Sequence, residues 1–236
     1  MTTTHAIPVT GDEAVAAIHH EAASDGWIVF CHGFLSDKTG SYEGRCRRAV
    51  EEGFNAVRFD FRGCGESDGE FVDATLSSRI ADLRSVLDYF DPGSYVLFGS
   101  SFGGKVAFHA AVGDGRVDAV VTRAPVTYNR IFDDLRSEVA DGGGHRYETG
   151  DEIDARFFED LDGYSFADVE TRLDCPVAIF HGGEDESVAP THSFQAADNL
   201  DTDVLVEKFE SEGHRFSRGA EDRLRRRMFE WLATVR

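Results

Sequence analysis

Six nearly continuous apolar runs alternate with helical stretches along this chain, and the alternation constrains its fold more than any other feature. Apolar runs without polar alternation indicate strands that are buried on both faces, as in a parallel sheet with helices on each side. We therefore predict a doubly wound, mostly parallel α/β sheet, preceded by an antiparallel strand pair at 6–9 and 14–20. The six predicted strands span 27–31, 56–61, 95–98, 117–122, 177–180 and 204–209.

Five helical stretches connect or follow these strands, at 42–52, 76–90, 102–112, 191–200 and from about 220 onward. Segment 126–172 interrupts the alternation with two short helical patterns, at 131–140 and 152–161, joined by Asp141-Gly142-Gly143-Gly144. We predict that 126–172 forms a small helical cap, inserted into an α/β core made of residues 1–125 and 173–236.

Between the predicted strand 95–98 and the helix that follows it stands Gly99-Ser100-Ser101-Phe102-Gly103. A sharp strand-to-helix turn lifts a serine hydroxyl clear of the backbone, where a base and N–H donors can reach it. Glycine is needed two residues before and two after the serine, since a Cβ there would collide with the neighbouring strand or helix. This context predicts that Ser101 is a nucleophile.

A second match to the same spacing, Gly65-Glu66-Ser67-Asp68-Gly69, has a different context. Three residues separate it from the preceding strand, and an acidic, glycine-rich stretch follows it instead of a helix. A short motif is only as specific as its structural surroundings. We therefore favour Ser101 over Ser67.

Two further strand ends carry residues that suit a serine nucleophile. An open parallel sheet places its ligand crevice at the carboxyl ends of its strands. Asp185 follows the strand 177–180, and His214 follows the last strand in a Gly-His turn. Ser101 needs a base and His214 needs a carboxylate that fixes its tautomer, so the three form a predicted catalytic triad. Glu184 and Glu186 are the competing carboxylates.

Three other histidines and one glycine-rich turn have structural interpretations. We expect His32 to shape the loop after the strand 27–31, and His181 and His192 to be structural. The stretch 60–69 has the glycines of a phosphate-binding loop but lacks its Lys-Ser/Thr ending. We interpret it as a turn that lines the site.

Taken together, these motifs resemble those of the α/β-hydrolase family over nearly the whole chain. His32-Gly33-Phe34 and Asp60-x-Arg62-Gly63-x-Gly65-x-Ser67-x-Gly69 also match. The resemblance implies Ser101 as nucleophile, His214 as base and Asp185 as its orienting acid. It also implies an oxyanion hole made by the backbone N–H groups of Phe34 and Phe102. The turns and the short cap look most like cinnamoyl/feruloyl-type esterases and monoacylglycerol-lipase-like carboxylesterases.

The expected activity is hydrolysis of a small-molecule carboxylic ester, with a short to medium acyl or an aryl-acyl group, through an acyl-enzyme. No metal or organic cofactor is implied. Tyr128, Phe132, Phe158, Tyr164 and Val188 are candidate walls of the acyl pocket, although the cap aromatics suit a cap core equally well.

Other functions are possible on the same fold. A thioesterase needs the same residues, and an aminopeptidase or acyl-peptide hydrolase needs a charged anchor for a peptide amine that the sequence does not identify. A non-catalytic binding protein is disfavoured because all three triad positions are filled.

Charge excludes some partners. The 44 acidic and 24 basic residues give a net charge of −20, which disfavours nucleic acid as a partner. Only Lys38, Lys105 and Lys208 are lysines, and this composition resembles that of proteins from salt-accumulating halophiles. The basic cluster at Arg223 and 225–227 shares a helix with apolar residues at helical spacing, and we interpret it as that helix's solvated face.

The remaining composition suggests a cytoplasmic protein without a membrane partner. The first residues lack the basic and apolar regions of a signal peptide, and no apolar run approaches the ~20 residues that span a bilayer. The four cysteines are scattered without ligand-like spacing, so we expect buried free thiols. The sequence defines no oligomeric state.

Overall fold

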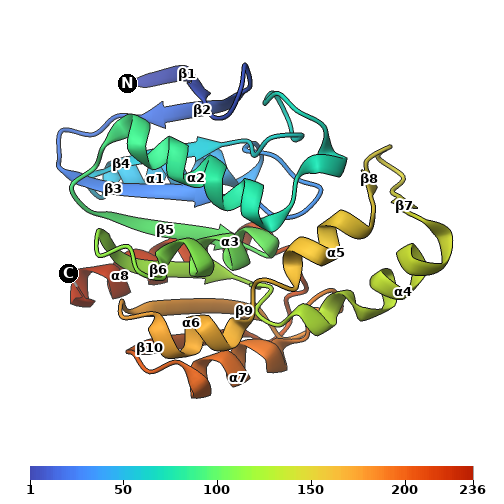
Figure 1. Cartoon of the computed structure of the whole chain (residues 1–236). Helices are drawn as coiled ribbons and strands as arrows, with labels where there is room; N and C mark the ends of the chain where they lie inside the picture. The colour runs from blue at the N-terminus through green and yellow to red at the C-terminus, as the bar shows by residue number, and fades with distance from the viewer. Residues whose placement is uncertain (236) are drawn as a thin grey trace.

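The computed structural model describes residues 1–235 and contains one eight-stranded sheet flanked by helices (Figure 1). The strand order is β1-β2-β4-β3-β5-β6-β9-β10, with β1 antiparallel to β2, β2 antiparallel to β4, and all other neighbours parallel. The predicted mostly parallel, doubly wound α/β sheet is therefore confirmed. Its strands are β1 (Thr2–Pro8), β2 (Ala14–His20), β3 (Gly26–Cys31), β4 (Phe54–Phe59), β5 (Tyr95–Ser100), β6 (Val117–Arg123), β9 (Val177–Gly182) and β10 (Val204–Phe209).

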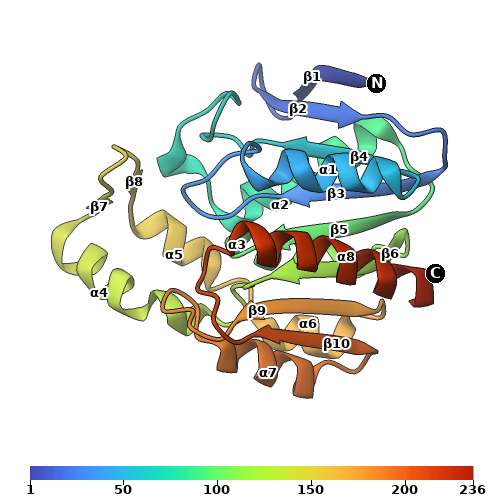
Figure 2. The same cartoon turned by 180° about the vertical axis from the view of Figure 1, so that it is seen from behind.

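Helices cover both faces of the sheet. The helices α1 (Ser41–Glu51) and α8 (Arg218–Val235) lie on one face, which is turned to the viewer in Figure 2. The other face carries α2 (Leu76–Phe90), α3 (Phe102–Ala111), α6 (Phe166–Arg172) and α7 (Pro190–Asn199), all in front of the sheet in Figure 1. Each face therefore has its own hydrophobic core.

Helix α2 shows how local sequence sets these elements. The Thr75 side chain accepts a hydrogen bond from the backbone N–H of Ser78 at 3.2 Å and caps the helix start. Apolar residues at spacings of 4, 3 and 4 form the stripe that faces the sheet, and Asp91 ends the helix in the left-handed conformation, at φ 46°. The stripe consists of Leu76, Ile80, Leu83 and Leu87, and the helix has the predicted bounds.

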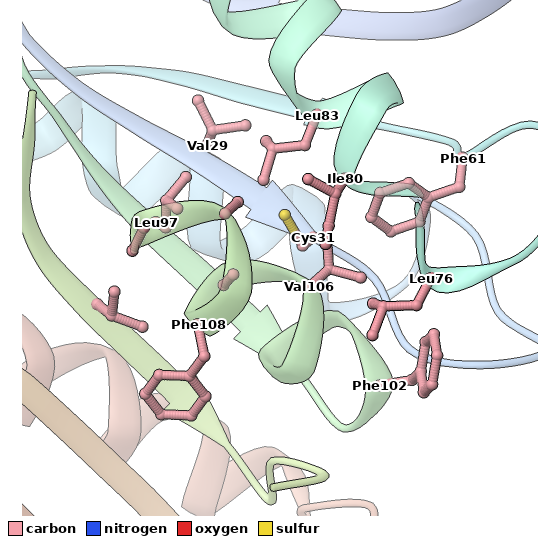
Figure 3. Close-up of a cluster of buried hydrophobic side chains, with 14 of the residues drawn as sticks. Val29, Cys31, Phe61, Leu76, Ile80, Leu83, Leu97, Phe102, Val106 and Phe108 are labelled. Carbon is pink, nitrogen blue, oxygen red and sulfur yellow. The ribbon is translucent and has the colours of Figure 1, made fainter. Parts of the chain in front are cut away.

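The core on this face holds the strand-to-helix turn of the predicted nucleophile in place. Figure 3 shows Val106 and Phe102 of α3 beside Cys31 of β3 and the apolar side chains of α2. Phe102 and Val106 are fully buried, and each such side chain stabilises the fold by roughly 1.5–3 kcal/mol. The first turns of the helix that begins at the predicted nucleophile are therefore anchored in the core.

The predicted cap segment, which interrupts the alternation of strands and helices, projects beyond the sheet (Figure 1). It contains the 3-10 helix η2 (Asn129–Phe132), α4 (Asp133–Gly142), β7 (His145–Arg146), β8 (Glu152–Ile153) and α5 (Ala155–Leu161). The predicted helix 152–161 begins only at Ala155. Glu152 and Ile153 instead pair with β7, and the Asp154 carboxylate caps α5 by accepting from the Arg156 N–H at 2.9 Å.

Several strand bounds also differ from the sequence prediction; β1, for example, begins at Thr2 rather than at residue 6. Two further differences have a visible structural cause. Helix α6 was not predicted, and it packs on core helix α3 through Phe108 and Phe166, whose ring centroids lie 5.3 Å apart. Strand β4 ends at Phe59 rather than Phe61, because the N–H of Phe61 turns inward and donates to Nε2 of His32 at 3.1 Å. Both differences come from contacts between distant parts of the chain.

Two compositional predictions can be compared with the structure. Cys31, Cys46, Cys64 and Cys175 are all free and buried, as predicted, and burial raises the pKa of the Cys46 thiol to about 12. Within residues 1–235, none of the helices combines the length and apolar character that crossing a membrane requires.

Candidate active site

Ser101 sits on a strained turn between β5 and α3. Its backbone has φ 52° and ψ −120°, a conformation that costs energy in a residue with a side chain. A Cβ on Gly99 would lie 2.3 Å from the Gly103 carbonyl oxygen, and one on Gly103 would lie 2.3 Å from the oxygens of Cys31 and His32. Only glycine fits at these two positions, which is the physical reason for the motif.

The second motif has a different structural role. The Ser67 hydroxyl donates to the carbonyl oxygen of Asp60 at 2.7 Å and accepts from the N–H of Ala16 at 2.8 Å. The first bond closes the turn after β4 on itself, and the second ties that turn to β2. Ser67 is thus engaged in the fold, whereas the Ser101 hydroxyl has no hydrogen-bond partner within residues 1–235 and lines a cavity.

Asp185 and His214 form a hydrogen-bonded pair. His214 Nδ1 donates to Asp185 Oδ2 at 2.8 Å. Asp185 Oδ1 accepts from the N–H groups of Ser187 at 2.9 Å and of Val188 at 2.8 Å, which fix the carboxylate in its turn. The structure pairs the predicted acid with the predicted base, while Glu184 and Glu186 are exposed.

His181, interpreted from the sequence as structural, also contacts the acid. Its Nε2 lies 3.2 Å from Asp185 Oδ2 and 2.9 Å from the Val188 carbonyl oxygen, and its Nδ1 is 2.6 Å from Ser193 Oγ. Burial alone raises the pKa of Asp185, but the hydrogen bonds from His181, His214 and the Val188 N–H outweigh it and hold that pKa well below its usual range. The carboxyl group of Asp185 is therefore ionised in the folded protein at neutral pH.

The two predicted oxyanion donors come from different elements: Phe34 lies in the loop after β3, and Phe102 begins α3. Within residues 1–235, neither the N–H of Phe34 nor that of Phe102 has an acceptor, so both remain available to a ligand oxygen. His32 Nε2 accepts from the Phe61 N–H at 3.1 Å, which leaves the proton on Nδ1 to donate to the Gly33 carbonyl at 2.8 Å. Burial, with the charge of Arg79, lowers the pKa of His32 to about 4, so the ring is neutral in this role.

A cavity of about 440 Å³ joins these parts. Ser101 and His214 both line it, together with Phe34 and Leu35 of the loop after β3, called the oxyanion loop below. Its other walls are mostly polar, with the aromatic rings of Tyr42 and Phe216 among them. They come from the loop before α1, the start of α1, the end of β6, the segment that follows His214 and the start of α8. The cavity therefore brings the predicted nucleophile, base and one oxyanion donor to one space.

The candidate acyl-pocket residues do not line this cavity. Phe132 packs against Phe34 and Phe102, with ring centroids 6.3 and 5.9 Å away, and so adjoins the oxyanion loop. Three others make contacts elsewhere: Tyr128 with Glu170, Phe158 with Arg136 and Phe157, and Tyr164 with Ser77 and His109. Val188 contacts the predicted acid Asp185 and His181 through its backbone.

No metal site accompanies the triad residues in the part of the chain that the structure describes. Nowhere in it do three or more His, Cys, Asp or Glu side chains gather as metal ligands would. The charged groups near Ser101 instead pair with one another, through Arg45, Arg123 and Glu221. Sequence reasoning did not identify these three residues, because they come from three distant parts of the chain.

Comparison with known families identifies the fold. The sequence model of the alpha/beta hydrolase family matches residues 28–231, which is most of the chain. The chain belongs to the alpha/beta hydrolase family. This alpha/beta hydrolase is 29% identical over 204 residues to the human mitochondrial palmitoyl-protein thioesterase ABHD10. That alignment covers 77% of the chain and spans 65% of the human protein's length.

Solved structures agree with the family assignment. Mouse alpha/beta hydrolase domain-containing protein 10 superimposes with a TM-score of 0.89 at 23% identity, covering 99% of this chain and all of that one. Est1E of Butyrivibrio proteoclasticus with ferulic acid bound gives 0.85 at 18% identity, covering 97% and 99%. A monoacylglycerol lipase of Paleococcus ferrophilus gives 0.77 at 18% identity, covering 94% and 99%. These likenesses confirm the resemblance at the level of the fold.

Proposed function

We propose that this alpha/beta hydrolase is a serine hydrolase that cleaves carboxylic esters or thioesters through an acyl-enzyme on Ser101. The observation that carries the proposal is the 2.8 Å bond between His214 and Asp185 beside a cavity that Ser101 shares with His214. A hydroxyl, an oriented imidazole and an ionised carboxylate in this order are the parts that acyl transfer needs.

In the first half-reaction, Ser101 Oγ attacks the substrate carbonyl carbon while His214 Nε2 takes the serine proton. Asp185 stabilises the imidazolium that results, because its carboxylate stays ionised and bonded to Nδ1. The carbonyl oxygen becomes an oxyanion, which the N–H groups of Phe34 and Phe102 would bind. His214 then returns the proton to the departing alcohol or thiol, and the acyl group remains on Ser101.

The second half-reaction repeats these steps with water. His214 removes a proton from water, the resulting hydroxide attacks the acyl-enzyme, and the same two N–H groups receive the oxyanion. When the intermediate collapses, Ser101 regains its proton from His214 and the carboxylic acid leaves. The protein supplies all the groups, and each is a residue that the structure describes.

We propose thioesters and oxygen esters equally as substrates. The 29% identity to a protein named palmitoyl-protein thioesterase favours a thioester, while the cap aromatics near Phe34 suit a short to medium or aryl-acyl group. The chemistry is the same for both, since only the atom that His214 protonates changes. We propose the range from acetyl to octanoyl, with hydroxycinnamoyl groups, and place the enzyme in a salt-rich cytoplasm.

The test is a hydrolysis panel in which one butanoyl group is presented as an oxygen ester, a thioester and an amide, with an emulsified long-chain triglyceride added. The wild type should turn over the ester and the thioester and leave the amide and triglyceride nearly untouched. Ser101→Ala should lose activity by several orders of magnitude. A preference for the amide would favour the aminopeptidase alternative, and a folded protein inactive on all four substrates would favour a binding protein.

A further inference from the structure

A buried arginine and a largely buried one share one carboxylate beside the cavity. Arg45, which is 1% exposed, donates from Nη2 to Glu221 Oε1 at 2.7 Å and from Nε to Oε2 at 3.2 Å. The side chain of Arg123 is 12% exposed, and its Nε lies 3.9 Å from the same Glu221. Glu221 can neutralise only one of them, so these three residues together carry one positive charge, which the carboxylate of Asp185 also faces, within a chain of net charge −20.

Arg123 is held in a fixed position beside the base. Its Nη1 donates to the His214 carbonyl oxygen, and its Nε lies 3.4 Å from Ser100 Oγ. Burial, with the charge of Arg45, lowers the pKa of Arg123, which shows that the surroundings penalise its charge. A buried charge in this position gains free energy from a counter-anion.

The walls of the cavity add further groups that suit an anion. Arg215 lines it, is exposed, and makes no ion pair or hydrogen bond within residues 1–235. Helix α1 begins in the same wall at Ser41 without a side-chain cap, so its first N–H groups add partial positive charge. Two carboxylates line the same cavity. Asp37 is already bonded to the N–H and hydroxyl of Thr39, and Glu221 is already bonded to Arg45.

These cationic groups lie on the same side of Ser101 as His214, which is the side where the leaving group of the substrate must be. His214 must protonate the departing alcohol or thiol, so that part of the substrate lies on the His214 side of Ser101. Arg123, Arg215 and His214 line one cavity. The aromatic cluster of Phe102, Phe132 and Phe157, by contrast, packs against Phe34 and does not line it.

We propose that the leaving group of the substrate carries an anionic group, a carboxylate or a phosphate, which binds Arg123 and Arg215 in this cavity. The proposal rests on the function proposed above and narrows its substrate class. The guanidinium of Arg123 provides a charge-assisted donor that is partly shielded from solvent, and Arg215 provides a second one at the surface.

The experiment compares butanoate esters that differ only in the leaving group: 4-hydroxybutanoate, its neutral amide 4-hydroxybutanamide, and 3-hydroxypropyl phosphate. All are assayed at one KCl concentration at which the protein is fully folded. We expect kcat/KM for at least one anionic ester to exceed that for the amide on the order of tenfold to a hundredfold, the range of one charge-assisted hydrogen bond. The carboxylate and phosphate arms show which anion is preferred.

Single-residue variants test which side chains cause the preference for an anionic leaving group. Arg215→Gln should lower the anion-to-amide ratio several-fold, and Arg123→Gln should abolish it. Because the ratio is measured within one variant, a general loss of activity from a shifted His214 does not change it. Arg84→Gln, at an exposed position on α2 away from the cavity, is the matched control and should keep both the ratio and the activity.

Three results would overturn the inference. Equal turnover of the anionic esters and the amide would refute it while leaving the ester hydrolase intact. If the preference for anionic esters persisted in both Arg123→Gln and Arg215→Gln, the anion would bind at a site other than these two arginines. If the wild type hydrolysed none of these esters and also failed on the earlier panel, the proposed function itself would fall, and the inference with it.

Discussion

Asp185 Oδ2 accepts a hydrogen bond from His214 Nδ1 at 2.8 Å, while its other oxygen accepts two backbone N–H groups from the turn that follows. In this arrangement, neither orientation of an asparagine side chain at position 185 could reproduce the hydrogen bonds of the carboxylate. Its oxygen must face the two N–H donors, so its NH₂ group must face His214. The imidazole would then carry its proton on Nε2, where it can no longer accept one from Ser101.

We therefore predict that Asp185→Asn lowers kcat by roughly 10³–10⁴-fold with little change in the fold. Glu184→Gln and Glu186→Gln are matched controls, since both side chains are exposed and neighbour the acid in sequence. Steady-state kinetics on the butanoyl ester, with circular dichroism of each variant, measure the effect. A larger loss in either glutamine variant would show that the acid is wrongly assigned.

A second prediction concerns His32 as a positioning residue. Its Nδ1–H bond holds the Gly33 carbonyl, and because this peptide bond is trans, the N–H of Phe34 points to the opposite side. His32→Leu should lower kcat by about 10–100-fold and leave KM nearly unchanged, because the oxyanion forms only after binding. His32→Gln, which can both donate to Gly33 and accept from Phe61, should recover much of the rate.

The pH dependence separates this role from that of a base. With its pKa at about 4, His32 is neutral from pH 5 to 9, so the loss in His32→Leu should be the same at every pH in that range. A loss that grows or shrinks across the range would show that His32 titrates during catalysis. An equal fall in kcat/KM caused by a large rise in KM would show that it acts on binding instead.

A third prediction follows from Lys105, which is fully buried on α3 and donates to the Thr127 carbonyl at 3.0 Å. Burial lowers its pKa to about 7, from an ordinary value of 10.5. Between these pH values the unfolded chain binds more protons than the folded one, so folding stability should rise with pH by up to about 1.4 kcal/mol per unit. Below pH 7 the full cost of burying the lysine remains.

Lys105→Met should remove this dependence, because it fills the same space without a titrating group. Its stability relative to wild type should be most favourable below pH 7 and should decline toward pH 10, measured as free energies of unfolding in urea. The lost bond to Thr127 shifts all values equally. Lys208→Met, at the exposed lysine, is the control and should show no such trend. A pH-independent difference for Lys105→Met would refute the account.

A fourth prediction concerns salt. Lys38 and Lys105 are buried, so Lys208 is the only lysine at a surface with a large excess of carboxylates. Screening should relieve their repulsion, since the Debye length falls from ~10 Å at 0.1 M salt to ~3 Å at 1 M. We propose a salt-accumulating cytoplasm as the working environment, and expect the Tm to rise steeply from 0.1 M to about 1 M KCl and then level off toward ~3 M.

The triple variant Asp12→Asn, Glu159→Gln, Asp201→Asn provides the control for screening. These side chains are exposed and have no ion-pair partner within residues 1–235. The variant should be more stable than wild type at 0.1 M KCl and should gain less from added salt. A wild-type Tm that is flat or falls with KCl would contradict the halophile interpretation.

The sheet, the sharp turn at Ser101 and the pairing of Asp185 with His214 were predictable because each has a local signal. The Ser101 turn requires glycine at 99 and 103 for steric reasons, and buried parallel strands have continuous apolar runs. Asp185 and His214 follow strands, and the sheet order brings β9 and β10 together at one edge. These relationships depend on rules of geometry that hold for any parallel sheet.

The charged groups behind the cavity were not predictable in this way. Arg45 and Glu221 are 176 positions apart in sequence, and they meet only because α1 and α8 cover the same face of the sheet. Asp185 follows His181 by only four residues, but spacing alone does not show that the turn brings the His181 ring onto the carboxylate. The sequence also could not show whether the aromatic residues of the cap line an acyl pocket or form the core of the cap, because both environments use the same side chains.

The most direct test of this account is to locate the nucleophile chemically. A fluorophosphonate probe reacts with an activated serine, and mass spectrometry of the digested protein identifies the labelled residue. We predict one adduct, on Ser101, that is lost in Ser101→Ala, strongly reduced in His214→Ala and retained in Ser67→Ala. An adduct on Ser67, or no adduct on the folded wild type, would contradict the central claim that Ser101 is the catalytic nucleophile.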